Sequence, residues 1–392
     1  IINASAQTGF NVRIPDLPMT VVQADGQNVR PVTVDEFQVG VAETYDVIVT
    51  PGDRAYSFVS ESIDRSGLGR ATLAPREGMS APLPPLRPRP LLTMTDMGMG
   101  GRDHSGMAGM DMSNAPNPAA VRGVDPSAQQ NASGKLWKLT GWTGPATTAA
   151  VGISAVGSVA APMAGMDHAA MGHGAAATAP PGAAGSMAGM DHGATSGATV
   201  PAMDHGSMNM RDMKLAPQVK DGPGVQTISP MPTDRTAEPP VGLEGLGHRV
   251  LTYRDLMAVE RNPDVRAPTR SMDIHLTGNM ERYMWSFDGV KLSEPAEPIP
   301  FRLNERVRVT LINDTMMPHP IHLHGHFFEL VTGHGANAPR KHTVNVPPGG
   351  KMTFDVTADA AGDWAFHCHN LYHMTAGMMR VVTVRSTAGE AA

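Results

Sequence analysis

The segment WAFHCHNLYHMTAGMM, residues 364–379, holds the only cysteine in the 392-residue chain. His367 and His369 flank Cys368 directly, and His373 and Met378 follow the cysteine at intervals of five residues. If the segment begins as a β-strand, successive side chains point to opposite faces, so the two flanking histidines share one face and the cysteine takes the other. The tripeptide His367-Cys368-His369 can therefore supply ligands to two metal sites, one on each face of the strand.

A second histidine cluster, HPIHLHGH at residues 319–326, supplies partners for both sites. If the loop that follows Cys368 folds back, Cys368, His373 and Met378 come together. They would then meet His319, which lies at the end of a neighbouring strand. Two histidines, one cysteine and a distant methionine are the ligand set of a blue-copper electron-transfer site. The soft sulfur ligands suit an ion that cycles between Cu(I) and Cu(II).

The other histidines of the two clusters are predicted to point away from that site. His322 and His324 are two residues apart and share a face, as do His367 and His369. Four imidazoles suit copper in a cluster that binds O2. The covalent path from Cys368 to either adjacent histidine would carry an electron between the two sites.

Composition excludes several other classes of function. The formal net charge is −6, and the sequence contains no basic block combined with aromatic residues. A nucleic-acid partner is therefore not indicated. A single cysteine rules out an internal disulfide framework. The number of methionines, 28, is unusually high, and their positions in the chain are informative.

Two β-rich regions flank a segment of different texture. Residues 1–90 alternate apolar and polar residues between turn signals, as in FNVRIP (10–15) and YSFVSE (56–61), and no helical periodicity is present. Residues 246–392 return to this pattern, with about nine strand candidates from HRVLTY (248–253) to MMRVVTV (378–384). Their spacing predicts a Greek-key β-sandwich.

Residues 91–245 are rich in Gly, Ala, Pro, Met and Asp-His pairs, with MAGMDH at 163–168 and again at 187–192. Such a linker has too few large apolar groups to offset its ordering entropy, so we expect it to be disordered or loosely held. Its uncharged part, residues 144–165, is not Leu/Ile-rich, and we expect no stable membrane insertion. Thioethers prefer Cu(I), so the linker is either a copper-capturing segment or a low-complexity spacer. The candidate weak Cu(I) ligands are Met107, Met110, Met163, Met166, His168, Met187, Met190, His192, Met203 and His205.

The two histidine clusters resemble the C-terminal signatures of the multicopper oxidases, a laccase-like family. FNVRIPDLPMTVVQADGQNV, NDTMMPHPIHLHG and the MDH-containing linker are most similar to the bacterial copper-resistance oxidases of that family. The resemblance implies an all-β chain of two cupredoxin-like Greek-key β-sandwich domains joined by the Met/His-rich linker. Residues 1–90 would be part of the family's second domain, and residues 246–392 its last domain.

The resemblance also implies a role for each ligand. His319, Cys368 and His373 would bind type 1 copper with Met378 as axial ligand, His322 would bind type 2 copper, and His324, His367 and His369 would bind type 3 copper. Cu(I) or a phenol would be oxidised near His373 at the type 1 copper. Electrons would pass through Cys368 and its neighbours to O2, giving water. The implied compartment is the periplasm.

Half of the implied trinuclear cluster is missing from this sequence. The family's cluster takes histidine pairs from four HxH motifs, of which His322/His324 and His367/His369 are two, and residues 1–90 contain no histidine. The chain opens on IINASAQTGF as if a strand were already under way. We therefore expect a fragment without the family's first domain, unable to reduce O2 by itself.

Several alternatives stay open at this point. A copper-binding or sequestering protein without turnover, or a single-site electron-transfer cupredoxin, would use the same residues. A zinc site explains Cys and His but not the paired HxH strands. A cupredoxin of the copper nitrite-reductase kind, or a buried structural cysteine, leaves the flanking histidines unexplained.

Residues near the two clusters are expected to be structural. We predict His275, His334 and His342 to be surface or structural residues, and Met316 and Met317 to pack around the type 1 site. The alternative for the two methionines is a route for Cu(I).

Overall fold

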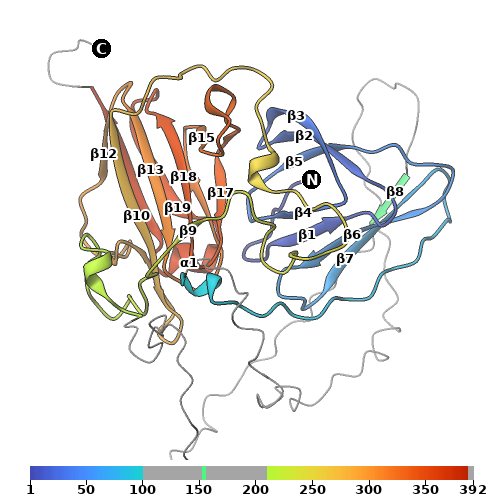
Figure 1. Cartoon of the computed structure of the whole chain (residues 1–392), viewed down its shortest axis with the longest axis horizontal. Coiled ribbons are helices and arrows are strands. Elements are labelled where there is room, and N and C mark those ends of the chain that lie inside the picture. The colour runs from blue at the N-terminus through green and yellow to red at the C-terminus, as the bar shows by residue number, and fades with distance from the viewer. Residues whose placement is uncertain (100–151, 156–209, 387–392) are drawn as a thin grey trace, which may run out of the picture. The chain divides into compact units, whose positions relative to one another are not determined.

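The computed structural model describes residues 1–99, 152–155 and 210–386 (Figure 1). In these ranges the regular structure is almost entirely β, and the described helices are one five-residue α-helix and short 3-10 turns. The all-β prediction is confirmed. All the candidate Cu(I) ligands between Met107 and His205 lie outside the described residues. No helix in the described ranges is long and apolar enough to cross a membrane.

The N-terminal β region is built from two sheets, with strand orders β4-β1-β6-β7-β8 and β3-β2-β5. Asp25 and Gly26 form a two-residue turn between β2 and β3, and both have positive φ, as the favoured hairpin turns require. The strands are β1 (Phe10–Arg13), β2 (Met19–Ala24), β3 (Gln27–Val34), β4 (Glu36–Val39), β5 (Tyr45–Ile48), β6 (Tyr56–Ser62), β7 (Leu68–Ala74) and β8 (Gly152–Ala155).

The core between these sheets also takes residues from far along the chain. Leu251 and Leu256 are buried in it, beside Val21, Phe37 and Tyr45. The strand expected over 248–253 does not form. One bridge, Glu36 to Val250, precedes the 3-10 turn η9 (Tyr253–Asp255), which is closed by a capping box.

The C-terminal β region is a second pair of sheets. One has the order β11-β10-β13-β18-β15-β16 with β9 paired to β18, and the other has the order β12-β20-β19-β14-β17 (Figure 1). The strands are β9 (Thr233–Asp234), β10 (Arg270–Asn279), β11 (Met284–Phe287), β12 (Ile299–Arg302), β13 (Arg306–Asn313), β14 (His319–Leu323), β15 (Phe328–Leu330), β16 (Arg340–Lys341), β17 (Thr343–Val346), β18 (Gly350–Thr357), β19 (Gly362–Cys368) and β20 (Met379–Arg385).

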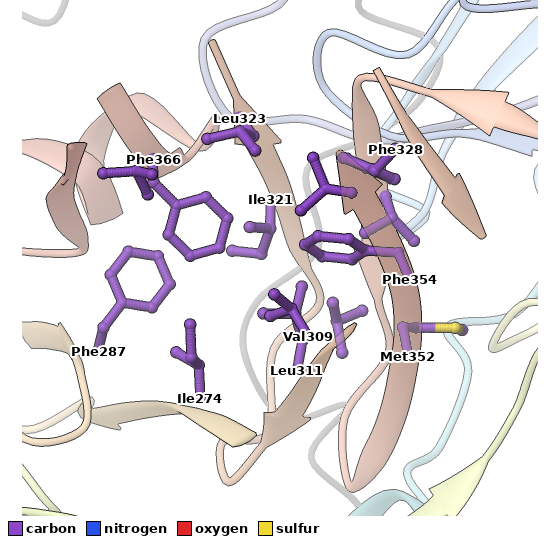
Figure 2. Close-up of a cluster of buried hydrophobic side chains, with 14 of the residues drawn as sticks. Ile274, Phe287, Val309, Leu311, Ile321, Leu323, Phe328, Met352, Phe354 and Phe366 are labelled. Carbon is purple, nitrogen blue, oxygen red and sulfur yellow. The ribbon is translucent and has the colours of Figure 1, made fainter. Parts of the chain in front are cut away.

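The core of this sandwich is aromatic and aliphatic (Figure 2). Phe287 stacks on Phe366 with ring centroids 5.1 Å apart, and Phe328 stacks on Phe354 at 4.2 Å. Ile321 of β14 is fully buried among them. Alternation along β14 and β19 therefore turns one face of each strand into this core and the other face away from it.

Residues 210–245, the last part of the predicted linker, are ordered against the C-terminal sandwich. The backbone N–H of Lys220 donates to the carbonyl of Asp288 at 2.9 Å, and that of Gln226 donates to Gly278 at 3.0 Å. The 3-10 turn η8 (Met213–Leu215) leads into a small buried cluster, and β9 adds to β18 in parallel. This part differs from the loose segment that we expected, because the sandwich satisfies its backbone groups. The domain limits themselves stay predictions.

A buried cation joins the two β regions. Lys341 on β16 is 0% exposed, and its Nζ lies 3.0 Å from Asp25 Oδ2 and 3.2 Å from Glu43 Oε1. The hydroxyl of Tyr253 donates to the same oxygen of Glu43 at 2.7 Å. Burial disfavours the lysine charge, but Asp25, Tyr45 and Glu43 outweigh this, and the pKa of Lys341 lies above its usual range. The ammonium group is therefore charged and neutralised inside the protein.

Replacing Lys341 by alanine would leave two buried carboxylates without their cation. We expect the free energy of unfolding to fall by about 3–5 kcal/mol, measured by denaturant titration. The exposed Lys214→Ala is the matched control and should change stability by no more than about 0.5 kcal/mol. Equal effects of the two variants would contradict a structural role for this ion pair.

Candidate metal centre

Two paired strands position both histidine clusters. β14 and β19 run antiparallel, with Ile321 opposite Cys368 and His322 opposite His367. Because side chains alternate, Cys368 shares the core-facing side with Ile321, and the two histidines share the opposite side. This is the back-to-back arrangement that the sequence predicts.

On the core side, His319, Cys368 and His373 meet. All three are 0% exposed, and their ligand atoms lie within 4.8 Å of one another. The sulfur of Cys368 is 3.6 Å from His319 Nδ1 and 3.8 Å from His373 Nδ1, and the two Nδ1 atoms are 3.2 Å apart. Among the described residues this is the single set of three or more His, Cys, Asp or Glu side chains with such spacing.

The loop after β19 returns the chain to this site through a short helix. α1 (Leu371–Thr375) carries His373, and Gly377 follows with φ 131°. A Cβ at Gly377 would lie 2.5 Å from the carbonyl oxygen of Trp285, so the turn requires glycine. The backbone of Met378 then donates to His373 at 3.0 Å and accepts from Cys368 at 3.1 Å.

Met378 is the predicted axial ligand, and its side chain is fully buried in the core of the C-terminal sandwich. Its backbone bonds to both His373 and Cys368 keep it at the site. The structure thus brings together His319, Cys368 and His373 and buries Met378 in the same core cluster as Cys368.

Both ligand imidazoles are held, His319 at its outer edge and His373 across its face. His319 Nε2 lies 2.7 Å from Thr315 Oγ1, whose hydroxyl donates to Asn313 Oδ1 at 2.9 Å and so accepts from the ring. The Nδ1 of each imidazole faces the sulfur. Trp285 stacks on His373 with centroids 3.9 Å apart and an interplanar angle of 22°.

The protonation states at this site follow from burial. Burial raises the pKa of the Cys368 thiol above its usual range and lowers that of His373 to about 4. Burial, with a smaller contribution from His373, holds the pKa of His319 well below its ordinary value. Two neutral imidazole nitrogens and one sulfur, shielded from water, are a donor set that fits copper and does not fit a hard cation.

On the opposite side, four imidazoles gather. His324 Nε2 and His367 Nε2 are 3.0 Å apart, and the ring of His322 lies 4.7 Å from that of His324 and 5.7 Å from those of His367 and His369. Burial lowers the pKa of His322 to about 3 and that of His367 to about 4. His324 is exposed. The imidazoles of this half-open face can serve as metal ligands.

His342, which we predicted to be a surface or structural residue, contacts this second cluster. The Nδ1 of His322 donates to the carbonyl of His342 at 2.7 Å, and the two rings are 5.0 Å apart. This bond leaves Nε2 of His322 free for a ligand. Of the other histidines, His275 is a buried partner of Asp314 at 2.7 Å, and the half-buried His334 bonds to the carbonyl of Arg254 at 2.7 Å.

The low histidine pKa values predict a pH dependence of the metal-free chain. Below about pH 6.5, His322, His367 and His373 bind protons in the unfolded chain but stay neutral when buried in the folded chain. The free energy of unfolding should therefore fall as the pH drops toward 4. Each histidine contributes on the order of 1–3 kcal/mol. Denaturant titrations at several pH values should show a shallower slope for His373→Gln and the wild-type slope for His334→Gln. A His373→Gln slope equal to the wild type would contradict this assignment.

Comparison with known proteins gives a consistent result. Two family models, both described as multicopper oxidase, match residues 1–77 and 266–388. Copper resistance protein A of Escherichia coli is 46% identical over 387 residues, which cover 98% of this chain and 54% of that protein. Copper resistance protein A of Pseudomonas syringae pv. tomato is 45% identical, and the match covers 98% of this chain and 55% of that protein.

Solved structures that match this chain include Fet3p, a multicopper oxidase that functions in iron import, at 15% identity and a TM-score of 0.45, with the match covering 98% of this chain and 54% of that one. The laccase from Botrytis aclada has the same identity and TM-score, and the match covers 97% of this chain and 50% of the laccase chain. The chain spans about half the length of the curated relatives it matches. The family expected from the histidine clusters is confirmed: this chain belongs to the multicopper oxidases, whose cofactor is copper.

Proposed function

We propose that this chain is the electron-accepting part of a copper-dependent oxidase of the copper-resistance type. The buried set of His319, Cys368 and His373, back to back with a second set of histidines across one strand, is the observation that carries the proposal. The overall reaction of the complete protein would be oxidation of a reductant coupled to reduction of O2 to water. Family membership favours this function over copper sequestration without turnover.

His319, Cys368 and His373 would hold the type 1 copper, and Met378 would be its fourth ligand. Bound copper would supply one-electron chemistry at this position. The protein's part is to keep the two Nδ1 atoms and the sulfur converged and to exclude water from them, since all three residues are fully buried. The stacked indole of Trp285 and the hydroxyl of Thr315 fix the two rings.

The backbone links the two ligand sets. Cys368 is bonded directly to His367 and His369, so consecutive Cα atoms about 3.8 Å apart separate the two sides of the strand. We propose that His322 serves as a type 2 ligand and that His324, His367 and His369 serve as type 3 ligands. These residues are half of the histidine set that a trinuclear cluster of this family uses, so O2 reduction would need histidines beyond those of this chain.

The donor we propose is Cu(I), with a phenol as the second candidate. A cavity of about 510 Å³ is lined by Pro318, the residue before His319, and by four methionines: Met280, Met316, Met317 and Met352. Met317 precedes His319 by two residues, and its carbonyl accepts from Asn313 at 2.7 Å. Thioether sulfur is a soft ligand that favours Cu(I). Asp64 and Glu238 also line the cavity, together with Arg89 and with Arg235, whose guanidinium donates to Glu238 at 2.6 Å. We also propose, from the resemblance to the copper-resistance oxidases, that the protein works in the periplasm.

Replacing Cys368 by serine tests the type 1 assignment. We expect the copper-loaded wild-type chain to be intensely blue, and Cys368→Ser to lose that colour and about one copper per chain, because a hydroxyl is a harder ligand than a thiolate. Copper analysis and visible absorption are the measurements, with His334→Gln as a histidine variant outside the site. An unchanged spectrum in Cys368→Ser would contradict the assignment.

The chain alone should accept electrons without consuming O2. Mixed with excess Cu(I), the blue form should bleach in a stoichiometric burst, and an oxygen electrode should record no uptake above a copper-only control. Sustained oxygen uptake would contradict the proposal that O2 reduction needs histidines beyond those of this chain.

The methionines of the cavity should matter for Cu(I) and not for other reductants. Met316→Leu combined with Met317→Leu keeps the side-chain volume but removes both sulfurs, so we expect slower bleaching by Cu(I) and unchanged bleaching by a phenol. Stopped-flow absorption measures both rates. Met272→Leu, which removes a thioether packed against the core on β10, is the matched control. Equal rates with Cu(I) in all variants would contradict a Cu(I) entry site here.

A further inference from the structure

A glutamine from the start of the chain closes the outer edge of His373. Gln7 Nε2 lies 3.1 Å from His373 Nε2, and Gln7 Oε1 is buried without a hydrogen-bond partner. His373 is 0% exposed, so water does not compete for this edge. A buried amide oxygen without a donor is unfavourable, which points to an interaction that this oxygen is placed to make.

The loop that carries Gln7 is held firmly. Asn3 donates through its side chain to the carbonyls of Thr8 at 2.9 Å and Val39 at 3.0 Å, and Ser5 Oγ donates to Thr8 at 2.6 Å. The backbone N–H of Leu371 donates to the carbonyl of Ala6 at 2.7 Å. Leu371 is the first residue of α1, the helix that carries His373, so the loop and the ligand are tied to each other one residue away from Gln7.

The chemistry of the ring decides which amide atom the site needs. His373 Nδ1 faces the sulfur of Cys368 and the Nδ1 of His319. A neutral imidazole that binds a metal through Nδ1 carries its proton on Nε2 and donates it to a neighbouring acceptor. An amide oxygen accepts such a proton and an amide nitrogen does not. A half-turn of the Gln7 amide exchanges the two atoms and gives both Oε1 and the ring a partner.

We propose that Gln7 is a positioning residue for the type 1 centre, whose Oε1 accepts the Nε2–H of His373 when the ring binds copper through Nδ1. This inference rests on the proposed type 1 site. An acceptor at Nε2–H makes the imidazole a stronger donor, which favours the oxidised ion and lowers the reduction potential. Gln7 would thereby do for His373 what Thr315 does for His319, but from the other β region.

The test measures the reduction potential of the blue chain by spectroelectrochemistry. For Gln7→Leu we expect the ratio of Cu(II) to Cu(I) affinity to fall about tenfold, a rise of about 59 mV for a one-electron couple. Gln7→Glu should move the potential in the opposite direction, because a carboxylate is the stronger acceptor. Gln23→Leu on β2 removes another half-buried glutamine, one that bonds to Asn28, and should leave the potential at its wild-type value.

A second readout follows the proton itself. In the diamagnetic Cu(I) form, the Nε2–H of His373 should exchange slowly with solvent in the wild type and faster in Gln7→Leu, as seen by nuclear magnetic resonance. If Gln7→Leu matches Gln23→Leu, or if both Gln7 variants shift the potential in the same direction, the proposal is overturned. A wild-type chain that binds copper without any blue absorption would instead overturn the proposed function.

Discussion

The antiparallel pairing of β14 with β19 is the constraint on which both histidine clusters depend. Its register sets Ile321 against Cys368 and His322 against His367. A slip of one residue would turn the cysteine toward the open face and the histidines into the core. The stacked aromatic rings on one side of these strands resist such a slip, since Phe366 would leave the core with the cysteine. Hydrophobic packing thus fixes the chemistry of both faces.

The N-terminal β region orients residues of both clusters. Asp25 accepts backbone N–H bonds from His342 at 3.1 Å and Thr343 at 3.2 Å while it neutralises Lys341. The carbonyl of the same His342 fixes the ring of His322. On the other face, the loop before β1 reaches α1 and His373. A region that holds no histidine of its own therefore sets the orientation of histidines on both sides of β19.

Much of this arrangement could be predicted from local pattern. Alternation along HPIHL and AFHCH assigns each ligand to a face, and the copper-ligand set formed by Cys368, His373 and His319 suggests that the loop after Cys368 folds back. The contacts that come from distant parts of the chain could not be predicted. Gln7 and His373 are 366 residues apart, and nothing near Gln7 in the sequence marks it. Trp285 and His342 are further cases, since their roles depend on which strands become neighbours.

Segments that lie between the two cores show the same limit in another form. The stretch 248–253 alternates like a strand, yet Leu251 enters the N-terminal core while Thr252 and Asp255 close a capping box, so tertiary burial overrides the local pattern. The opposite holds at the type 1 residues, where local and tertiary demands agree. Each ligand there is fixed by a strand, a glycine turn or a hydrogen bond at its outer edge. A site held in this way would keep its geometry when the charge at its centre changes by one, which is the property that the proposed electron transfer requires.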